Sequence, residues 1–484
     1  MAVRHSLAVV VMPAEALPFA SGEASGLEQL GGASPAMVNS LTDIAGTRRA
    51  RPGISVWPSF PVSTPNVSPI DGMAVWNSMV IYVTRDRKLW VWSADGVVTP
   101  LSDSTTATQL GGTLRPVLLP TRTRLIATGG GVPQKWAGTG LSAPLGGSPP
   151  LLSHVTDIAT RLVGSYPDAS GIFYWSGLGE TVGHEFWDAL NFAEAEAKPD
   201  PIVALAENTN ELFAFGSETL QVFSPDPTVG FAPGRTVNLG LLAPYSLIKV
   251  DDAFAFLDRE RRFVLTDGRS FSDEESVISK PIEAKLRALT VSDVWGFRLR
   301  NDRWDACVWF FPTNGFGYIW NRRSNLWSEW RAFGAADYAA PAITSAAYWP
   351  ERNLMLVGLT NGQIAQLDAG AYTDLGGIIK VELVTGFVDH GTDNRKKCRS
   401  VKFIFRRGQT TSSVDPRVEI SYRDDLGSYS QPSIYSLGLA GDYDATIEMR
   451  SEGVYRRRQW RIVYTSVEEF SFVGAREEFD VLAN

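Results

Sequence analysis

Large aromatic side chains concentrate in one stretch of the chain, where they could stack against a sugar ring or a nucleic-acid base. Residues 301–330 read NDRWDACVWFFPTNGFGYIWNRRSNLWSEW and hold five of the fifteen tryptophans. Tryptophan also fills protein cores and is enriched at protein interfaces. Spacing alone does not separate these uses, so the elements that carry the tryptophans must be identified first.

Residues with catalytic or metal-binding chemistry are few. None of the four histidines (positions 5, 154, 184 and 390) forms a pair at metal-ligand spacing. Cys307 and Cys398 lie far apart in the chain, which favours two buried thiols over a disulfide framework. Neither GxxxxGK[ST] nor GxSxG occurs. Carboxylates abound, so a glycosidase pair stays available, but we predict a non-enzyme with no catalytic, cofactor-binding or metal-binding residues.

The charge balance is acidic. The formal net charge is −8, from 45 Lys+Arg and 53 Asp+Glu. Residues 378–484 hold 16 of each sign, which leaves 29 basic and 37 acidic residues for the first 377. This argues against a general nucleic-acid binder, whose affinity depends on cations that meet phosphates. No apolar run reaches the roughly 18 residues of a membrane span, so we expect no membrane insertion by this chain.

The tryptophan-rich stretch itself predicts a meander of antiparallel strands. Apolar runs at Ala306–Phe311, Phe316–Trp320 and Leu326–Phe333 are separated by the short polar segments 312–315 and 322–325. Such segments have turn chemistry.

The same strand-and-turn layout recurs along the chain. Strand centres fall near 91, 222, 264, 319 and 365, and candidates at 134–136 and 171–177 fill the long gap. A loose period of about 40–50 residues is typical of a β-propeller with one four-stranded blade per period. We predict six to eight blades over residues 51–375, seven units being visible. Trp304, Trp309, Trp320 and Trp327 are then expected to be mostly packing, with a sugar platform or a protein interface as the alternatives.

Two regions lie outside the repeats. Residues 1–50 are rich in Ala, Gly and Ser and are expected to form an extended N-terminal arm that orders on a neighbouring subunit. Asn39–Arg49 is its best helical candidate. Residues 376–484 are expected to form a C-terminal β-sandwich that serves assembly, with strands at Val381–Val388, Ser400–Phe405, Arg417–Tyr422, Ala445–Met449 and Gln459–Thr465.

Basic clusters in the C-terminal region are the clearest electrostatic feature. A solvated face, a contact with an acidic protein surface and a DNA contact are the three interpretations. Taken as candidate assembly contacts, these residues are Arg395, Lys396, Lys397, Arg406, Arg407, Arg456, Arg457 and Arg458. Reversing the charge of residues 456–458 is expected to impair assembly while the monomer stays folded.

The order of these features resembles the tail hub or nozzle proteins of short-tailed bacteriophages, also called packaged-DNA stabilisation proteins. The resemblance runs over about residues 46–480, and GSETLQVFS at Gly216–Ser224 is its most persuasive part. The matching pieces are Arg51–Ile54, Thr156–Pro167, Ile172–Ser176, Pro199–Pro225, Ile420–Leu439 and Gly453–Thr465.

The resemblance implies a structural virion protein that forms a ring, usually a hexamer, beneath the portal and its adaptor ring. Such a subunit extends the DNA channel, helps to retain packaged DNA and docks tail fibres, spikes or a needle, while DNA passes without specific binding. It would be assembled in the host cytoplasm and reside in the virion tail, with a role in DNA ejection as part of the head–tail connector. A carbohydrate-active or carbohydrate-binding propeller, either a glycosidase or a lectin-like module, is the alternative.

Overall fold

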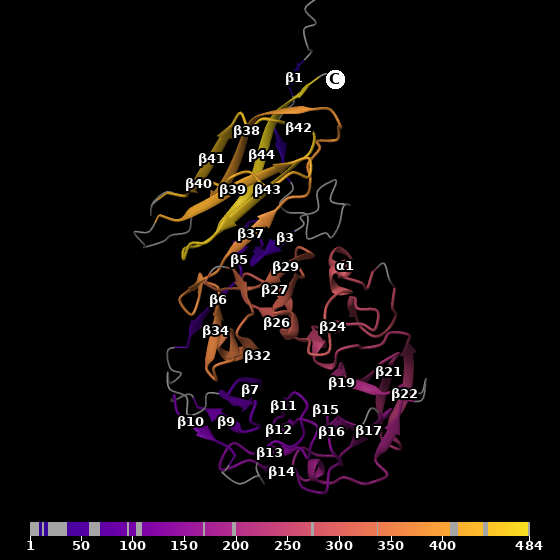
Figure 1. Ribbon diagram of the computed structural model, residues 1–484. Coiled ribbons are helices and arrows are strands. Elements are labelled where there is room, and N and C mark those ends of the chain that lie inside the picture. Colours follow the sequence, from indigo (N-terminus) through magenta and orange to yellow (C-terminus); the bar gives the residue numbers. More distant parts are fainter. Residues whose placement is uncertain are drawn as a thin grey trace, which may run out of the picture.

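Strands make up nearly all the regular structure. The computed structural model describes residues 9–11, 14–17, 36–57, 68–93, 96–102, 109–167, 170–195, 200–272, 275–335, 337–406, 415–438 and 444–482. Over these ranges the single α-helix is α1 (Glu283–Leu286), and the short 3-10 helices are η2 (Gly183–Glu185), η3 (Pro244–Ser246), η4 (Lys280–Ile282), η5 (Pro312–Asn314) and η6 (Pro350–Arg352). Figure 1 shows a ring of sheets below a β-sandwich. The expected all-β class is confirmed.

Sheets of consecutive antiparallel strands follow one another around the ring. The first sheet is formed by β7 (Ile70–Trp76), β8 (Met79–Thr84), β9 (Leu89–Trp92) and β10 (Val98–Pro100). The second is formed by β11 (Val117–Pro120), β12 (Leu125–Thr128), β13 (Gln134–Trp136) and β14 (Ala143–Pro144). The third sheet is formed by β15 (His154–Ile158), β16 (Arg161–Ser165), β17 (Ile172–Trp175) and β18 (Phe192–Glu194). The fourth is formed by β19 (Ile202–Asn208), β20 (Glu211–Gly216), β21 (Leu220–Asp226) and β22 (Gly230–Val237).

Three further sheets complete the ring. They are formed by β23 (Ile248–Val250), β24 (Ala253–Leu257) and β25 (Phe263–Thr266); by β26 (Trp295–Arg300), β27 (Asp305–Phe311), β28 (Phe316–Asn321) and β29 (Leu326–Trp330); and by β32 (Ile343–Trp349), β33 (Leu354–Leu359) and β34 (Ile364–Asp368). Each of the seven repeat units seen in the sequence coincides with the third strand of one sheet. The predicted β-propeller is therefore confirmed.

Two-residue turns join the first two strands in several sheets. Asn77-Ser78, Ala159-Thr160 and Thr209-Asn210 all have positive φ at both positions. This geometry is that of type I′ turns, whose twist matches the right-handed twist of paired strands. Local turn chemistry therefore sets the register of these hairpins.

Aromatic side chains pack between neighbouring sheets. The ring centroids of Phe263 and Trp309 lie 4.1 Å apart, and those of Trp309 and Trp327 5.8 Å apart. Trp304, Trp309, Trp320 and Trp327 are exposed by 0–4%. Their predicted role in core packing is confirmed, and these four indoles are not available as a sugar-stacking platform.

A segment from the start of the chain closes the ring. β6 (Gly53–Val56) pairs antiparallel with β34 and becomes the fourth strand of the last sheet. A Cβ atom on Gly53 would lie 2.5 Å from the carbonyl oxygens of Ala371 and Thr373. Glycine is therefore required where this strand enters the sheet.

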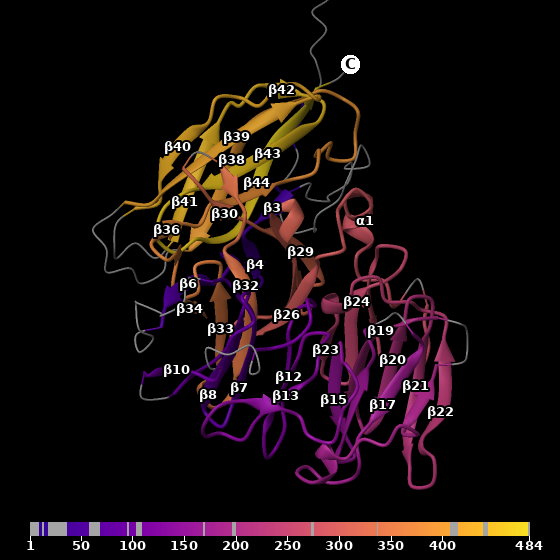
Figure 2. The same cartoon turned by 60° about the horizontal axis from the view of Figure 1, so that its bottom comes forward.

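The C-terminal part forms the expected β-sandwich around its own core (Figure 2). One sheet contains β4 (Ser40–Thr42), β5 (Arg48–Ala50), β38 (Lys396–Arg406), β41 (Asp444–Arg450), β42 (Val454–Tyr455) and β44 (Ser471–Leu482), with β1 (Val9–Val11) and β2 (Glu15–Ala16) on β44. The other contains β3 (Ala36–Val38), β37 (Val381–Val384), β39 (Arg417–Asp424), β40 (Ser433–Ser436) and β43 (Arg458–Tyr464). The short strands β30 (Ala332–Phe333), β31 (Tyr338–Ala339), β35 (Thr373–Asp374) and β36 (Gly377–Ile378) lie in the connection.

One strand joins the propeller to the sandwich. β3 lies parallel to β29 and antiparallel to β37, so the sheet that begins with β26 continues into the sandwich without a break. Both edges of β3 are thus paired with other strands.

The described parts of the N-terminal arm fold onto their own chain. β2 pairs with β44, and Leu17 and Met37 belong to the sandwich core. The expectation that the arm orders on a neighbour is therefore wrong for residues 14–17 and 36–50. β1 at residues 9–11 also pairs with β44, and the other residues of the arm lie outside the described part.

The helix expected at Asn39–Arg49 is also wrong, because these residues form β4, a turn and β5. Oδ1 of Asp43 accepts hydrogen bonds from the backbone N–H groups of Ala45 and Thr47. A side chain that bonds nearby backbone groups favours a turn over a helix. Pairing of β5 with β44 then fixes the extended form.

Arg51 lies where arm, ring and sandwich meet. Its buried guanidinium forms two hydrogen bonds with the Asp374 carboxylate, one of 2.9 Å, and lies 4.4 Å above the Trp330 ring. Its Nε donates to Oδ1 of Asn39, and Nη2 donates to the carbonyl of Arg331. One side chain thereby connects the closing strand, β29 and the segment that leads to the sandwich.

We predict that Arg51→Met lowers the free energy of unfolding by about 3–5 kcal/mol, because it leaves the Asp374 carboxylate without its buried partner. Urea denaturation followed by tryptophan fluorescence measures the effect. Arg85→Met is the control, since the Arg85–Asp71 pair is exposed at the arginine and such pairs contribute about 1 kcal/mol or less. Equal stability of the two variants would contradict the role of Arg51.

Candidate functional site

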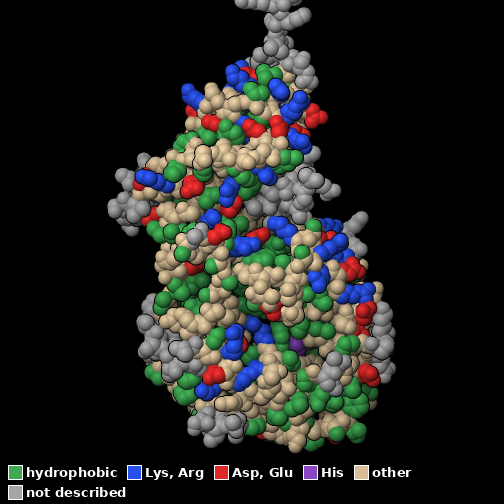
Figure 3. Space-filling view, in the orientation of Figure 1, with side chains coloured by type: hydrophobic (Ala, Val, Ile, Leu, Met, Phe, Trp, Pro, Cys, Tyr) green, Lys and Arg blue, Asp and Glu red, His purple; other side chains and the backbone are tan. Residues whose placement is uncertain are grey.

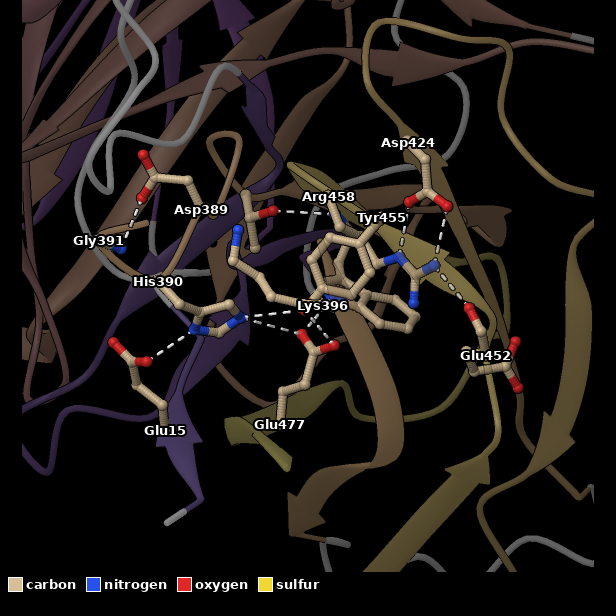
Figure 4. A network of polar contacts seen from close by, with 12 residues as sticks. Glu15, Asp389, His390, Gly391, Lys396, Asp424, Glu452, Tyr455, Arg458 and Glu477 are labelled. Atoms are coloured by element: carbon tan, nitrogen blue, oxygen red, sulfur yellow. Dashed lines mark hydrogen bonds and ion pairs between the residues drawn. The ribbon is translucent and has the colours of Figure 1, made fainter. Parts of the chain in front are cut away.

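A network of charged and polar side chains connects the N-terminal arm with the two sheets of the sandwich. Figure 4 shows Glu15 from the arm, His390 from the loop after β37, and Tyr455, Arg458 and Glu477 from the strands. Two of the predicted assembly residues, Lys396 and Arg458, lie in or beside this network.

Arg458 is held inside the sandwich. Its side chain is fully buried and forms a bidentate pair with Asp424, with Nε–Oδ1 and Nη2–Oδ2 distances of 2.7 and 2.8 Å. The guanidinium also lies between the rings of Tyr422 and Tyr455, 4.1 and 4.2 Å from their centroids. Arg458 is therefore a structural cation.

Glu477 is the buried carboxylate of the network. Tyr455 donates a 2.6 Å hydrogen bond to Oε1 of Glu477, and His390 Nε2 lies 3.6 Å from Oε2. Burial opposes ionisation, but the hydrogen bonds from His390 and Tyr455 outweigh it and hold the pKa of Glu477 below its usual value. On the other side of the imidazole, Nδ1 of His390 lies 2.7 Å from Oε2 of Glu15. The network thus fastens β2 of the arm to the sandwich.

The structure corrects part of the predicted assembly set. Lys396 and Arg458 are buried, and Nζ of Lys396 donates to the carbonyls of Thr392, Asn394 and Arg456, so neither side chain can meet a partner. Arg457 is half-buried. The exposed members of the set are Arg395, Lys397, Arg406 and Arg456, whereas Arg407 lies outside the described residues.

An exposed apolar segment that runs from the end of β17 to the first residue of β18 was not predicted. Its apolar side chains are exposed by 45–83%, and we call Leu178, Val182, Phe186, Leu190 and Phe192 the apolar loop. Glu185 anchors this loop to the neighbouring sheet through Arg124 and Lys135, and these contacts hold the pKa of Glu185 below its usual value.

Hydrophobic side chains are also exposed on the surface of the propeller. In Figure 3, hydrophobic side chains gather on the end of the propeller opposite the sandwich. Contiguous exposed apolar surface of this kind marks interaction sites. The long connection between two short strands, with six large apolar residues in the fifteen positions 178–192, is the sequence signal that could have revealed it.

The described residues form no metal-binding group. Among the described residues, no three His, Cys, Asp or Glu side chains are placed to hold a metal ion. Cys307 and Cys398 are both buried, as expected, and burial raises the pKa of each thiol. His154 lies on the propeller axis, His184 in η2 and His390 in the sandwich, while His5 is not described. No helix in the described ranges is long and apolar enough to cross a membrane.

The propeller axis holds a cavity of about 440 Å³. Its walls come from the first strand of each sheet, and Arg115, Tyr245 and Trp295 project into the lining. This volume is within the range of small-molecule sites, so the axis of one chain is not an open channel for a DNA duplex.

These features define a class: a β-propeller with an attached β-sandwich and exposed surfaces suited to contacts with other proteins. The family described as the bacteriophage P22 Gp10 β-propeller matches residues 52–327, more than half of the chain. The chain belongs to this family, and it is a structural component of a bacteriophage virion.

Other comparisons add only distant likenesses. A computationally designed protein, Ika8, is 12% identical with a TM-score of 0.41, over 66% of this chain and 100% of its own. BamB from Moraxella catarrhalis is 13% identical with a TM-score of 0.38, over 74% of this chain and 99% of its own. The search of curated proteins gave no significant match.

We predict that Arg458→Met lowers the free energy of unfolding by about 3–5 kcal/mol, since it leaves Asp424 without its partner and removes the cation between two rings. Arg456→Met, two positions away and exposed, should change it by no more than about 0.5 kcal/mol. Urea denaturation of both variants checks this difference. The triple charge reversal of residues 456–458 would therefore unfold the sandwich, and it does not test assembly.

Proposed function

We propose that the chain is the tail hub or nozzle subunit of a short-tailed phage. Six copies form a closed ring beneath the portal and its adaptor ring, extend the DNA channel, help to retain the packaged genome and dock fibres, spikes or a needle. The observation that carries the proposal is the family match over residues 52–327. We further propose that the chain has no enzymatic activity, which its membership of a structural phage family supports.

The closed propeller axis supports a channel built by several copies. A single chain encloses about 440 Å³ at its axis, so DNA would pass through the ring of subunits and not through the propellers. The net charge of −8 is compatible with a conduit that DNA crosses without specific binding.

The exposed cations of the sandwich are the proposed assembly contacts. Arg395, Lys397 and Arg406 flank or belong to β38, and Arg456 follows β42. The first 377 residues carry an excess of acidic side chains, 37 against 29 basic ones. Complementary charge of this kind speeds correct encounter between subunits and makes it sensitive to salt.

The apolar loop is the proposed docking surface for a tail appendage. It lies at the end of the propeller opposite the sandwich (Figure 1). If the sandwich faces the ring and its adaptor, this end stays free. Appendage proteins that bind there would cover apolar side chains, which is favourable because about 25 cal/mol is gained per Å² removed from water.

Particle assembly tests the proposal. Particles made without this chain should lose DNA and lack appendages, and purified wild-type protein should restore both. A variant with Arg395, Lys397, Arg406 and Arg456 changed to Glu should fold but fail to form the ring, because its sandwich no longer attracts acidic surfaces. Mass photometry of the protein measures ring formation, and electron microscopy of the particles shows whether they hold DNA and appendages.

The matched control carries charge reversals at Arg269 and Arg300, two exposed propeller arginines, and should assemble normally. Particles that retain DNA without the chain would contradict the tail-hub function. Normal ring formation by the fourfold variant would contradict only the basic contacts.

We further predict that Val182→Asp with Leu190→Asp leaves the ring intact but prevents attachment of the appendage, because it places charges within the apolar loop. The two side chains are 83% and 80% exposed, so folding should be unaffected. Val97→Asp with Val229→Asp, at exposed positions in other sheets, is the control. Appendage counts per particle equal to wild type would exclude the loop as the docking surface.

A further inference from the structure

The axial cavity is a separate feature of the propeller that no assembly role uses. Strands from all seven sheets supply its wall, and its volume of about 440 Å³ falls within the range of small-molecule sites. Figure 3 shows Lys and Arg side chains near the centre of this face. The cavity is therefore of a size and polarity for a small polar molecule.

The lining of the cavity holds two carboxylates, Asp71 and Glu207, and two cations, Arg115 and Lys249. Asp71 makes a bidentate pair with Arg85, and Glu207 pairs with Lys249. Arg115 makes no ion pair within the described residues. The charge of Asp71 acts on Arg115 and opposes the effect of burial on its pKa, but the Asp71 carboxylate is bonded to Arg85, so the Arg115 guanidinium has no directly bonded carboxylate.

The surroundings of Arg115 orient this guanidinium. Its Cζ lies 4.4 Å from the centroid of the Trp295 ring, and its Nη2 donates to the carbonyl of Thr344. Burial lowers the pKa of Arg115 to about 10, so the side chain stays charged at neutral pH. A half-buried cation without a directly bonded counter-charge is costly, and an anion in the cavity lowers that cost.

A second polar group in the lining also lacks a partner. The His154 ring is more than nine-tenths buried and stacks on Tyr245, with centroids 5.4 Å apart. Its Nε2 has no hydrogen-bond partner in the described part of the chain. Burial lowers the pKa of His154 to about 4, so the imidazole is neutral at pH 7 and offers a hydrogen bond without adding charge.

We propose that the axial cavity binds a small organic anion, whose carboxylate or phosphate group pairs with Arg115 and whose body, about the size of a monosaccharide, contacts Trp295, Tyr245 and His154. Arginine suits both headgroups because its planar fork forms two parallel hydrogen bonds with either. This inference is independent of the tail-hub function and of ring assembly.

Titration calorimetry and thermal unfolding of the full chain test the proposal with D-glucuronate, D-glucose 6-phosphate, acetate, inorganic phosphate and neutral D-glucose. We expect one site per chain for one or both sugar anions, with a rise in Tm on binding. Whichever sugar anion binds identifies the headgroup. Arg115→Gln should weaken binding at least tenfold, which is roughly the worth of a charge-assisted hydrogen bond.

Two controls keep the test decisive. Arg122→Gln, an exposed arginine outside the cavity, should bind like wild type. If Arg115→Gln fails to fold, His154→Phe serves instead and should weaken binding through the lost hydrogen bond. Binding by no sugar anion, equal binding of acetate and phosphate, or full affinity in the folded variants would each overturn the proposal.

Discussion

The buried contact of Arg51 with Asp374 and Trp330 is the constraint on which the architecture depends. A propeller is stable only when its last sheet meets its first, and here β6 must reach β34 after the chain has already passed through β3, β4 and β5 in the sandwich. Arg51 precedes β6 by two residues and fixes the point at which the chain leaves one body and enters the other.

This arrangement makes the two bodies one structure. β3 extends the sheet of β26–β29 into the sandwich, and the network of His390 and Glu477 attaches the arm to the far side. Hydrogen bonds and packing, and not a flexible linker, therefore join the propeller to the sandwich. In the proposed ring, a movement of the sandwich would therefore move the propeller with it.

The distribution of side chains explains why the surface, and not a cleft, is the natural site of function. The tryptophans that suggested ligand stacking are buried in the packing of the sheets, where large rings fill the space between neighbouring sheets. What remains outside is an acidic propeller, a sandwich with exposed cations at Arg395, Lys397, Arg406 and Arg456, and the apolar loop. The axial cavity is a concave site in whose lining Arg115 has no directly bonded carboxylate.

The sequence by itself determined the repeating sheets, because turn residues such as Asn77-Ser78 and alternation within strands act over a few positions. It was also enough to predict five strands of the sandwich and the burial of Trp309. Only the tertiary structure decided that Asn39–Arg49 is a hairpin, that Lys396 and Arg458 are buried, and that residues 178–192 present an apolar surface. The reason is physical: each of these depends on partners hundreds of positions away or across a core, such as β44 for β5 and Asp424 for Arg458, and local pattern carries no information about them.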